Sequence, residues 1–367
     1  MNLIITGLGT ALPAEQIAQA DAAELATTFM VADARRKTFI DRVFQATRVR
    51  QRGSVLLEHS NGNGPQQSFY PPAANGEDRG PSTGDRMRCY AVHAVPLANQ
   101  AAAAALADAG VAAQEITHLI TVSCTGFFAP GLDEALTRRL GLQPEVGRLQ
   151  VGFMGCHGVF NALRAAEAFV LADNRARVLI CAVELCTLHY QYGGVEEDKL
   201  VANALFADGA AAVVAESTTQ HPEGNSGRWK LAALGSYLDV RGAHDMTWTI
   251  GNHGFEMTLS RRVPGLIGEQ FCPWFESWLS RQGYRVEDMG CWAVHPGGPR
   301  ILAAVAGSLK LPPEALRSSE EVLARYGNMS SPTILFVLDE LAHSGVELPC
   351  AAMAFGPGLV MEVAVFA

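Results

Sequence analysis

Short apolar runs and longer stretches with helical spacing alternate along most of the chain. Short strand-like runs predict strands at 1–7, 118–124, 148–153, 176–183, 210–215, 230–237, 291–294, 350–355 and 360–366. The continuous apolar character of the last two suits buried strands. Apolar residues that recur every three or four positions predict helices at 95–109, 131–140, 157–172, 263–282 and 333–342. This alternation indicates an α/β fold of stacked layers.

The succession of elements repeats after a polar break at 218–227. We therefore predict two similar halves, 1–217 and 218–367, which hint at internal duplication. Gly, Pro and Asn gather between 53 and 87 and predict a long ordered loop there. The helix at 95–109 is expected to stop at Gly110, a good C-cap residue.

Composition narrows the class of protein. The chain has 367 residues, of which 49% are hydrophobic and 18% charged, as in soluble globular proteins. The net charge of −9 disfavours generic binding to nucleic acid or anionic membranes, and no apolar run is long enough to span a bilayer. The first residues lack the features of a signal peptide, and the eight cysteines form no CxxC pair. We expect a cytoplasmic protein without a zinc site or disulfide framework.

One local cluster departs from the acidic balance. Seven basic side chains and a single acid, Asp41, lie between 35 and 52. Such a cluster can attract a phosphate-bearing ligand such as a nucleotide or coenzyme A. A solvated helix face explains it equally well.

Cys156 lies between a predicted strand and a predicted helix, in the run Val-Gly-Phe-Met-Gly-Cys-His-Gly at 151–158. The free N–H groups and the positive dipole end of a helix lower the pKa of a nearby thiol, and the thiolate is the nucleophilic form. On this segment alone, a buried structural cysteine is as good an interpretation.

Two later segments favour chemistry. His295 ends a predicted strand before a Gly/Pro turn, and Asn328 lies in the turn before the helix at 333–342. Singly, they read as a core histidine and a turn asparagine. Together with Cys156 they supply a nucleophile, a partner for its proton and donors for a developing oxyanion.

These segments resemble type III polyketide synthases, the chalcone synthase-like branch of the thiolase superfamily. His-Pro-Gly-Gly-Pro at 295–299 and Tyr-Gly-Asn-Met-Ser-Ser at 326–331 match the family's signatures closely. Further similar runs lie at 80–83, 204–211, 263–267 and 355–358, in the family's order along nearly the whole chain. The resemblance implies a thiolase-like, layered α-β-α-β-α fold of two similar halves, with the cysteine in the first and the histidine and asparagine in the second.

By that resemblance, Cys156 carries the acyl chain, and His295 and Asn328 stabilise the enolate formed when malonyl-CoA loses CO2. The enolate then attacks the acyl thioester, and repeated condensation on an acyl-CoA starter is followed by cyclisation. The resemblance also implies a homodimer and no metal or redox cofactor, with coenzyme A thioesters as substrates.

The resemblance also assigns substrate-binding positions. Phe206 matches a gating phenylalanine, and Met257 replaces the second gate aromatic. Ala129 stands where plant members place a methionine that reaches into the partner's cavity. Small side chains there and at Cys124 and Cys186 predict an extended apolar space.

The run at 182–191 is similar to bacterial alkylresorcinol or alkylpyrone synthases, which favours a long-chain fatty acyl starter and a pyrone or resorcinol-type product. Arg42 matches a family residue that contacts the coenzyme A phosphates. A second such position is Ala46 here, so Arg48 or Arg36 is expected to help.

Other classes of enzyme, and a non-enzyme, share parts of this pattern. Papain-like proteases also use Cys, His and Asn in this order, but no Cys-Gly-Ser-Cys-Trp run surrounds Cys156. Ketoacyl synthases that perform a single condensation share the fold and triad, and an aromatic-starter enzyme of the chalcone synthase type is a further alternative. A binding module that has lost turnover would show no acylation of Cys156.

Overall fold

The computed structural model describes residues 2–30, 34–58, 66–192, 197–220 and 229–367. One long sheet of nine strands dominates this part of the chain, in the order β11-β12-β13-β8-β1-β7-β6-β4-β5. Its strands are β1 (Leu3–Ala11), β4 (His118–Ser123), β5 (Gly147–Gly152), β6 (Val178–Leu185), β7 (Asp208–Ser217), β8 (Trp229–Leu238), β11 (Cys291–Val294), β12 (Cys350–Gly356) and β13 (Val360–Phe366). Two small sheets add β2 (Gln16–Ala18) with β3 (Gln51–Gly53), and β9 (Met246–Gly251) with β10 (Gly254–Leu259).

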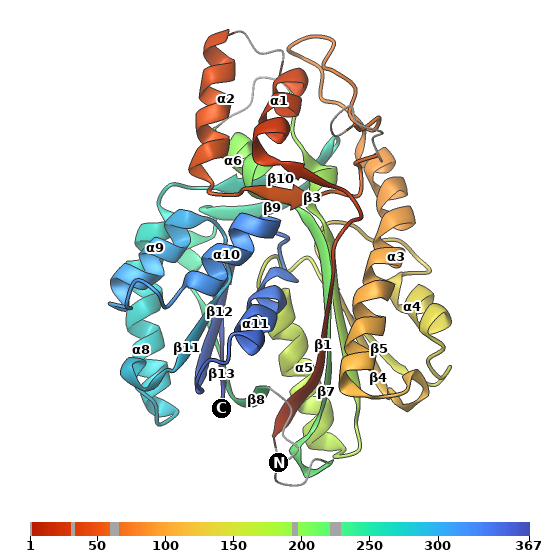
Figure 1. Ribbon diagram of the computed structural model, residues 1–367, viewed down its shortest axis with the longest axis vertical. Coiled ribbons are helices and arrows are strands. Elements are labelled where there is room, and N and C mark those ends of the chain that lie inside the picture. Colours follow the sequence, from red (N-terminus) through yellow and green to blue (C-terminus); the bar gives the residue numbers. More distant parts are fainter. Residues whose placement is uncertain (1, 31–33, 59–65, 193–196, 221–228) are drawn as a thin grey trace.

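The helices cover this sheet in layers (Figure 1). They are α1 (Gln19–Phe29), α2 (Ala34–Ala46), α3 (Thr83–Ala109), α4 (Leu132–Leu140), α5 (Gly158–Ala172), α6 (Glu197–Leu205), α7 (Val263–Leu266), α8 (Cys272–Arg281), α9 (Pro299–Ser308), α10 (Arg317–Tyr326) and α11 (Thr333–His343). Because β1 and β8 share only two residue pairs, the sheet behaves as two blades joined at a corner. Helices α5 and α11 lie between the blades, α3 and α4 cover one outer face, and α8 and α9 cover the other (Figure 1).

Strand alternation explains the layers. On β7, Ala211, Val213 and Ala215 pack into the middle layer, while the residues between them pack against the outer helices. On β12 the same division separates Ala352 from Met353. Both faces of these strands are therefore buried, as their unbroken apolar sequence predicts. The layered thiolase-like fold is confirmed, while the division at residue 217 stays a prediction.

The close packing of β1 on α3 depends on small residues. A Cβ on Gly7 would lie 2.3 Å from the carbonyl oxygen of Ala105, and one on Gly9 would lie 2.4 Å from its amide nitrogen. Glycine in the strand and alanine on the facing side of the helix let the two backbones approach this closely. The alanine-rich segment is therefore a packing surface.

Several expected bounds need correction. Helix α3 begins at Thr83, inside the predicted loop, where Ser82 and Asp85 form a capping box. The first half of α3 contains polar residues and Pro96, so it lacks the regular apolar spacing that predicts a helix. The predicted helix at 263–282 is two helices, α7 and α8, joined by a π-helical turn at Ile267–Phe271. The polar break begins with a 3-10 turn at Thr218–Gln220, while its residues 221–227 and residues 59–65 of the predicted loop lie outside the described part of the chain.

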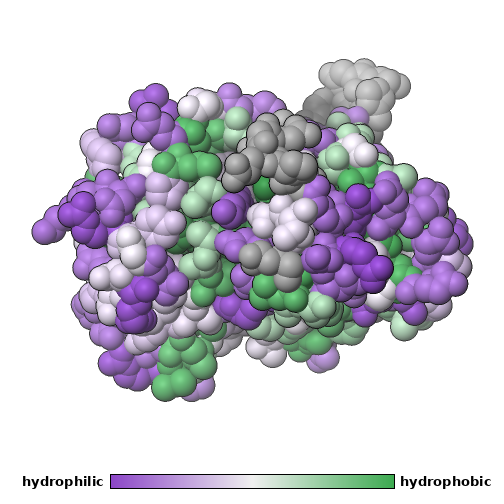
Figure 2. All heavy atoms as spheres, turned by 90° about the horizontal axis from the view of Figure 1, so that it is seen from below, coloured by the Kyte–Doolittle hydropathy of each residue, from purple (hydrophilic) through white to green (hydrophobic). Residues whose placement is uncertain are grey.

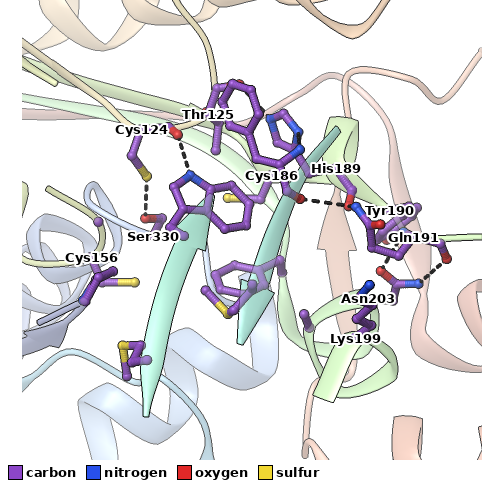
Figure 3. Close-up of a pocket in the computed structure, with 18 residues that line it drawn as sticks. Cys124, Thr125, Cys156, Cys186, His189, Tyr190, Gln191, Lys199, Asn203 and Ser330 are labelled. Carbon is purple, nitrogen blue, oxygen red and sulfur yellow. Dashed lines mark hydrogen bonds between the residues drawn. The ribbon is translucent and has the colours of Figure 1, made fainter. Parts of the chain in front are cut away.

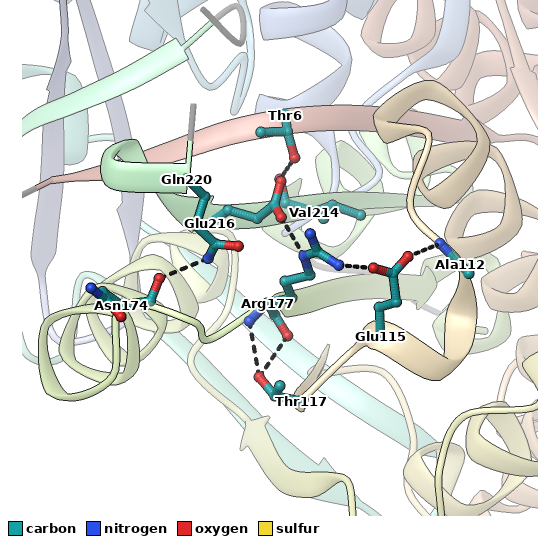
Figure 4. Close-up of polar contacts among 9 residues, drawn as sticks. All are labelled: Thr6, Ala112, Glu115, Thr117, Asn174, Arg177, Val214, Glu216 and Gln220. Atoms are coloured by element: carbon teal, nitrogen blue, oxygen red, sulfur yellow. Dashed lines mark hydrogen bonds and ion pairs between the residues drawn. The ribbon is translucent and has the colours of Figure 1, made fainter. Parts of the chain in front are cut away.

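Charged side chains form ion pairs at the end of the sheet where β7 finishes. The guanidinium of Arg177 donates to Glu216 on β7, at 2.6 Å, and also to Glu115 (Figure 4). Glu216 is almost fully buried, so this ion pair satisfies a carboxylate that would be costly alone. Seen from below, hydrophilic side chains dominate the outer sides of the molecule and hydrophobic ones show in smaller patches (Figure 2).

Candidate active site

A tight turn holds Cys156 between β5 and α5. Gly155 adopts a φ of +80°, and a Cβ there would lie 2.6 Å from the ring of Pro357. Only glycine combines that backbone angle with that contact. The side chain of Cys156 is buried, with the residue 9% exposed.

His295 and Asn328 reach the same place from the second half of the chain. His295 directly follows β11, and its amide donates to the carbonyl of Met353, at 2.8 Å. Asn328 follows α10, and its backbone bonds to Leu205 and Ala207, each at 2.9 Å. Its Oδ1 accepts from the amide of Ser330, at 2.8 Å, and its side-chain NH2, the donor, interacts with the sulfur of Cys156.

Three neighbouring cavities that share lining residues surround these side chains. A small cavity of about 30 Å³ is lined by Cys156, His295 and Asn328 together. It shares Leu205 with an outer cavity of about 250 Å³, and it shares Phe206 with an inner one of about 40 Å³. The three predicted catalytic residues therefore meet where the outer and inner cavities join.

A buried carboxylate supports the inner cavity. Glu184 accepts hydrogen bonds from the amide of Cys124, the hydroxyl of Thr125 and the hydroxyl of Ser331, at 2.7 to 3.1 Å. Burial raises the pKa of Glu184, while these donors oppose the shift. The network joins the ends of β4 and β6 to the turn that carries Asn328, so it holds the two halves in register around the site.

The expected thiolate needs correction. Burial raises the pKa of Cys156 to about 12, against the opposing effect of nearby Ser330 and Asn328. Burial also lowers the pKa of His295 to about 3. This loss of solvation favours a thiol and a neutral imidazole in the resting pair. His295 can then accept the thiol proton as Cys156 attacks.

This correction predicts a pH dependence. Because the pKa of Cys156 lies above neutrality, the thiolate fraction should rise with pH without a plateau. We expect the rate of Cys156 alkylation by iodoacetamide to increase about tenfold per pH unit between about pH 6 and pH 9. Mass spectrometry of the Cys156 peptide measures it. A rate independent of pH over this range would instead indicate a preformed thiolate.

The structure brings four of the predicted substrate-binding residues to the cavities. Phe206 and Met257 line both the junction and the inner cavity, as expected of gating positions. Cys124 and Cys186 line the inner cavity alone. Ala129 is exposed and is not among the residues that line the described cavities.

The extended apolar space is not found among the described residues. Trp248 donates its indole N–H to the carbonyl of Cys124, at 2.7 Å, and stands edge-on to the rings of His189 and Phe255. These rings occupy the room that the small side chains of Cys124 and Cys186 leave. The inner cavity of about 40 Å³ holds only about three water molecules.

The role of Arg42 and its basic neighbours stays a prediction, and the structure places them near the outer cavity but not in its wall. Arg42 is exposed and does not line the outer cavity, although Val43 and Ala46 on the same helix do. Arg48 forms an ion pair with Glu320. The cations that line the outer cavity are Arg261 and Arg300, which come from other segments.

Of the eighteen residues that line the inner cavity, the sequence analysis assigned only five to the site, and Trp248, Ser330 and Lys199 are among those it missed. Trp248 lies on the hairpin β9–β10, and a signal for that hairpin was present. Thr, Trp, Thr and Ile at 247–250, followed by Gly-Asn-His-Gly at 251–254, form a typical strand-and-turn pattern. No pattern in the sequence distinguishes Lys199 from an ordinary surface lysine.

This fold and this Cys–His–Asn site together define a class of protein, the condensing enzymes of the thiolase type. Residues 2–219 match the family model for the N-terminal domain of chalcone and stilbene synthases, and residues 240–367 match that for the C-terminal domain. The chain belongs to this family and is a type III polyketide synthase, an acyl-transferring enzyme.

Individual relatives agree. The chain is 32% identical to the alpha-pyrone synthesis polyketide synthase-like Pks18 of Mycobacterium tuberculosis, over 99% of this chain and 90% of that protein. It is 32% identical to 1,3,6,8-tetrahydroxynaphthalene synthase of Streptomyces peucetius, over 98% and 91%. The crystal structure of PKS-I from the brown alga Ectocarpus siliculosus superposes with a TM-score of 0.91 at 28% identity, covering 100% and 98% of the two chains.

The family match separates the chain from the proteases and ketoacyl synthases considered above. Among the described residues, none of the helices is long and apolar enough to cross a membrane.

Proposed function

We propose that this enzyme extends an acyl-CoA starter by iterative decarboxylative condensation with malonyl-CoA, with Cys156, His295 and Asn328 as its catalytic residues. The observation that carries the proposal is the single small cavity that all three line, at the junction of an outer and an inner cavity.

Loading comes first. His295 accepts the proton of Cys156 as the sulfur attacks the starter thioester, and the coenzyme A sulfur leaves with a proton. The outer cavity is wide enough for the pantetheine arm, and Arg261 and Arg300 at its wall suit the phosphates of coenzyme A. Burial of the loaded thioester in the inner cavity protects it from water.

Extension uses the same donors. The imidazole N–H of His295 and the side-chain NH2 of Asn328 donate to the thioester carbonyl of malonyl-CoA, and they stabilise the enolate as CO2 departs. The enolate carbon attacks the acyl carbonyl on Cys156, which frees the thiol and leaves the longer chain on coenzyme A. Repeated reloading leads to a linear polyketide that closes to a pyrone or resorcinol-type ring.

The size of the inner cavity favours a short starter. A long alkyl chain requires far more volume than about 40 Å³, and Trp248 is held across the cavity by its hydrogen bond to Cys124. A short acyl group fits with only small side-chain movements.

The test is incubation with malonyl-CoA and a panel of short, long and aromatic acyl-CoAs, followed by mass spectrometry of the products. We expect polyketides in which each extension adds two carbons, and acetyl-CoA or butyryl-CoA should outcompete palmitoyl-CoA by at least about tenfold. If malonyl-CoA is never consumed, the proposed function is wrong. Efficient use of palmitoyl-CoA would overturn only the preference for a short starter.

A homodimer is part of the proposal. Strand β5 is the edge strand at one end of the sheet, and apolar side chains around it are one-third to one-half exposed, namely Phe127, Leu149, Phe153 and Met154. An open strand edge with apolar neighbours suits pairing with a second copy across a twofold axis.

The Leu149→Asp variant tests this interface. The substitution would bury a carboxylate on each side of the twofold axis, so we expect the dimer dissociation constant to rise at least about hundredfold. Light scattering coupled to gel filtration measures the mass. Leu171→Asp, at a comparably exposed leucine on α5, is the matched control and should stay dimeric. Equal masses for both variants would place the interface elsewhere.

Independence from metals and redox cofactors and a cytoplasmic location stay predictions. The eight free cysteines are compatible with a reducing compartment.

A further inference from the structure

Lys199 stands at the inner cavity's far end and has no role in the reaction described above. Eighteen residues line this cavity, including Cys156, and among the described ones Lys199 is the only side chain that carries a full charge. The remaining ionisable group with a pKa near neutrality, His189, is kept neutral because burial lowers its pKa to about 3. Figure 3 shows Cys156 at one side of the cavity and Lys199 at the other.

Helix α6 sets the distance between the two ends. Lys199, Ala202, Asn203 and Phe206 line the cavity at a spacing of three or four residues, which places them along one face of the helix. Phe206 also borders the junction where Cys156 lies. Seven helical residues separate Lys199 from Phe206, a rise of roughly 10 Å. At about 1.2 Å for each extended bond, this distance matches a chain of about eight bonds.

The polar side chains that neighbour Lys199 already have hydrogen-bond partners within the protein. The positive charge of Lys199 is therefore what distinguishes this end of the cavity. The Asn203 side chain accepts from the Gln191 amide, at 3.2 Å, and donates to the Gln191 carbonyl, at 3.1 Å. The side-chain NH2 of Gln191 donates to the carbonyls of His189 and Phe255, each at 3.1 Å. The ammonium of Lys199 bonds to Glu256, at 3.0 Å, and has two further N–H donors. Glu256 is not among the residues lining the cavity, whereas its neighbours on β10, Phe255 and Met257, are. The strand thus turns Glu256 outward, where it holds the lysine at the end of the cavity.

We propose that Lys199 is a specificity-determining residue that binds an acidic group at the distal end of the starter acyl chain. This inference rests on the proposed function, because it concerns the acyl group that Cys156 carries. A chain with a thioester at one end and a carboxylate at the other, that is, a dicarboxylic acyl-CoA, matches an apolar cavity with a thiol at one end and one ammonium at the other. In the loading step the acyl–sulfur bond of coenzyme A breaks, the bond to Cys156 forms, and the thiol proton ends on the coenzyme A sulfur. The distal carboxylate stays ionised throughout.

Matched starters isolate the effect of the carboxylate. Succinyl-CoA and butyryl-CoA carry four-carbon acyl groups, and adipyl-CoA and hexanoyl-CoA carry six-carbon ones. Each pair differs only in a terminal carboxylate or methyl group. We expect the wild-type enzyme to load adipyl-CoA about tenfold more efficiently than hexanoyl-CoA, measured as kcat/KM for acylation of Cys156 by intact-protein mass spectrometry. Succinyl-CoA should gain less over butyryl-CoA, because its shorter chain does not span the distance to Lys199.

Two substitutions with opposite expected effects complete the experiment. Lys199→Met keeps the length of the side chain and removes its charge, so the preference for adipyl-CoA over hexanoyl-CoA should fall about tenfold while loading of butyryl-CoA and hexanoyl-CoA is unchanged. Glu256→Gln removes a competing carboxylate and should raise the preference. A role of the pair in folding alone would alter both members of a starter pair equally.

The outcomes are separable. If the wild-type enzyme loads both members of each pair equally, or if Lys199→Met keeps the preference for acidic starters, the inference about Lys199 is wrong and the proposed function stands. If no acyl-CoA acylates Cys156, the proposed function itself fails.

Discussion

Replacement of Cys156 by alanine should abolish both acylation and polyketide formation. The sulfur is the only atom at the junction that can form a thioester, and the neighbouring groups, His295 and Asn328, only move protons or donate hydrogen bonds. We expect product formation to fall by roughly 10⁴-fold or more, which is the scale seen when a nucleophile is removed. Product analysis and intact-protein mass spectrometry measure the two losses.

The Cys156→Gln variant separates loading from decarboxylation. Its side chain ends in a neutral carbonyl-bearing amide that mimics the acylated cysteine, and it leaves both donors in place. Malonyl-CoA should therefore still lose CO2 in this variant and yield acetyl-CoA, while no chain extension occurs. Cys89→Ala, at a cysteine on α3 outside the cavities, is the matched control and should keep full activity. Polyketide formation by Cys156→Ala would refute the role of the thiol.

Replacement of Asn328 by aspartate should have the second largest effect. The Oδ1 atom that accepts from the Ser330 amide is kept, so the turn should keep its geometry. The NH2 donor becomes a carboxylate oxygen, which repels the enolate instead of stabilising it. We expect malonyl-CoA decarboxylation to fall by about 10² to 10³-fold.

The measurement is CO2 release from malonyl-CoA, with acylation of Cys156 by a starter as an independent readout. Asn252→Asp, which adds the same charge at an exposed turn of the β9–β10 hairpin, is the control and should behave as the wild type. Decarboxylation at the wild-type rate in Asn328→Asp would show that Asn328 is not an enolate donor.

The fold was largely predictable because most of its strands are buried on both faces. The apolar runs at 291–294 and 360–366 coincide with β11 and β13, since a strand packed on both sides is apolar at nearly every position, and the buried exception, Glu362 on β13, is paired with Arg164. The β9–β10 hairpin escaped because it lies over the cavity and alternates apolar with polar residues. Because the hairpin was not predicted, Trp248 was not assigned to the cavity. The cavity was therefore expected to be larger than it is.

The meeting of the three proposed catalytic residues was predictable, and their ionisation was not. Cys156, His295 and Asn328 stand in sequence motifs at the ends of elements, so position along the chain was enough to bring them together. The pKa of a thiol depends on how completely neighbouring segments exclude water, and those segments come from both halves of the chain. Small residues at Cys124 and Cys186 likewise indicated space that aromatic rings from β9 and β10 fill.

The protonated resting state of Cys156 has a consequence for the lifetime of the enzyme. Peroxide attacks a thiolate and not a thiol, and the product, a sulfenic acid, would block the acyl chain. A buried thiol whose proton leaves only when a thioester arrives is exposed to such oxidants for a small part of each catalytic cycle. The same burial that demands proton transfer to His295 thus shields the sulfur from oxidative damage between turnovers.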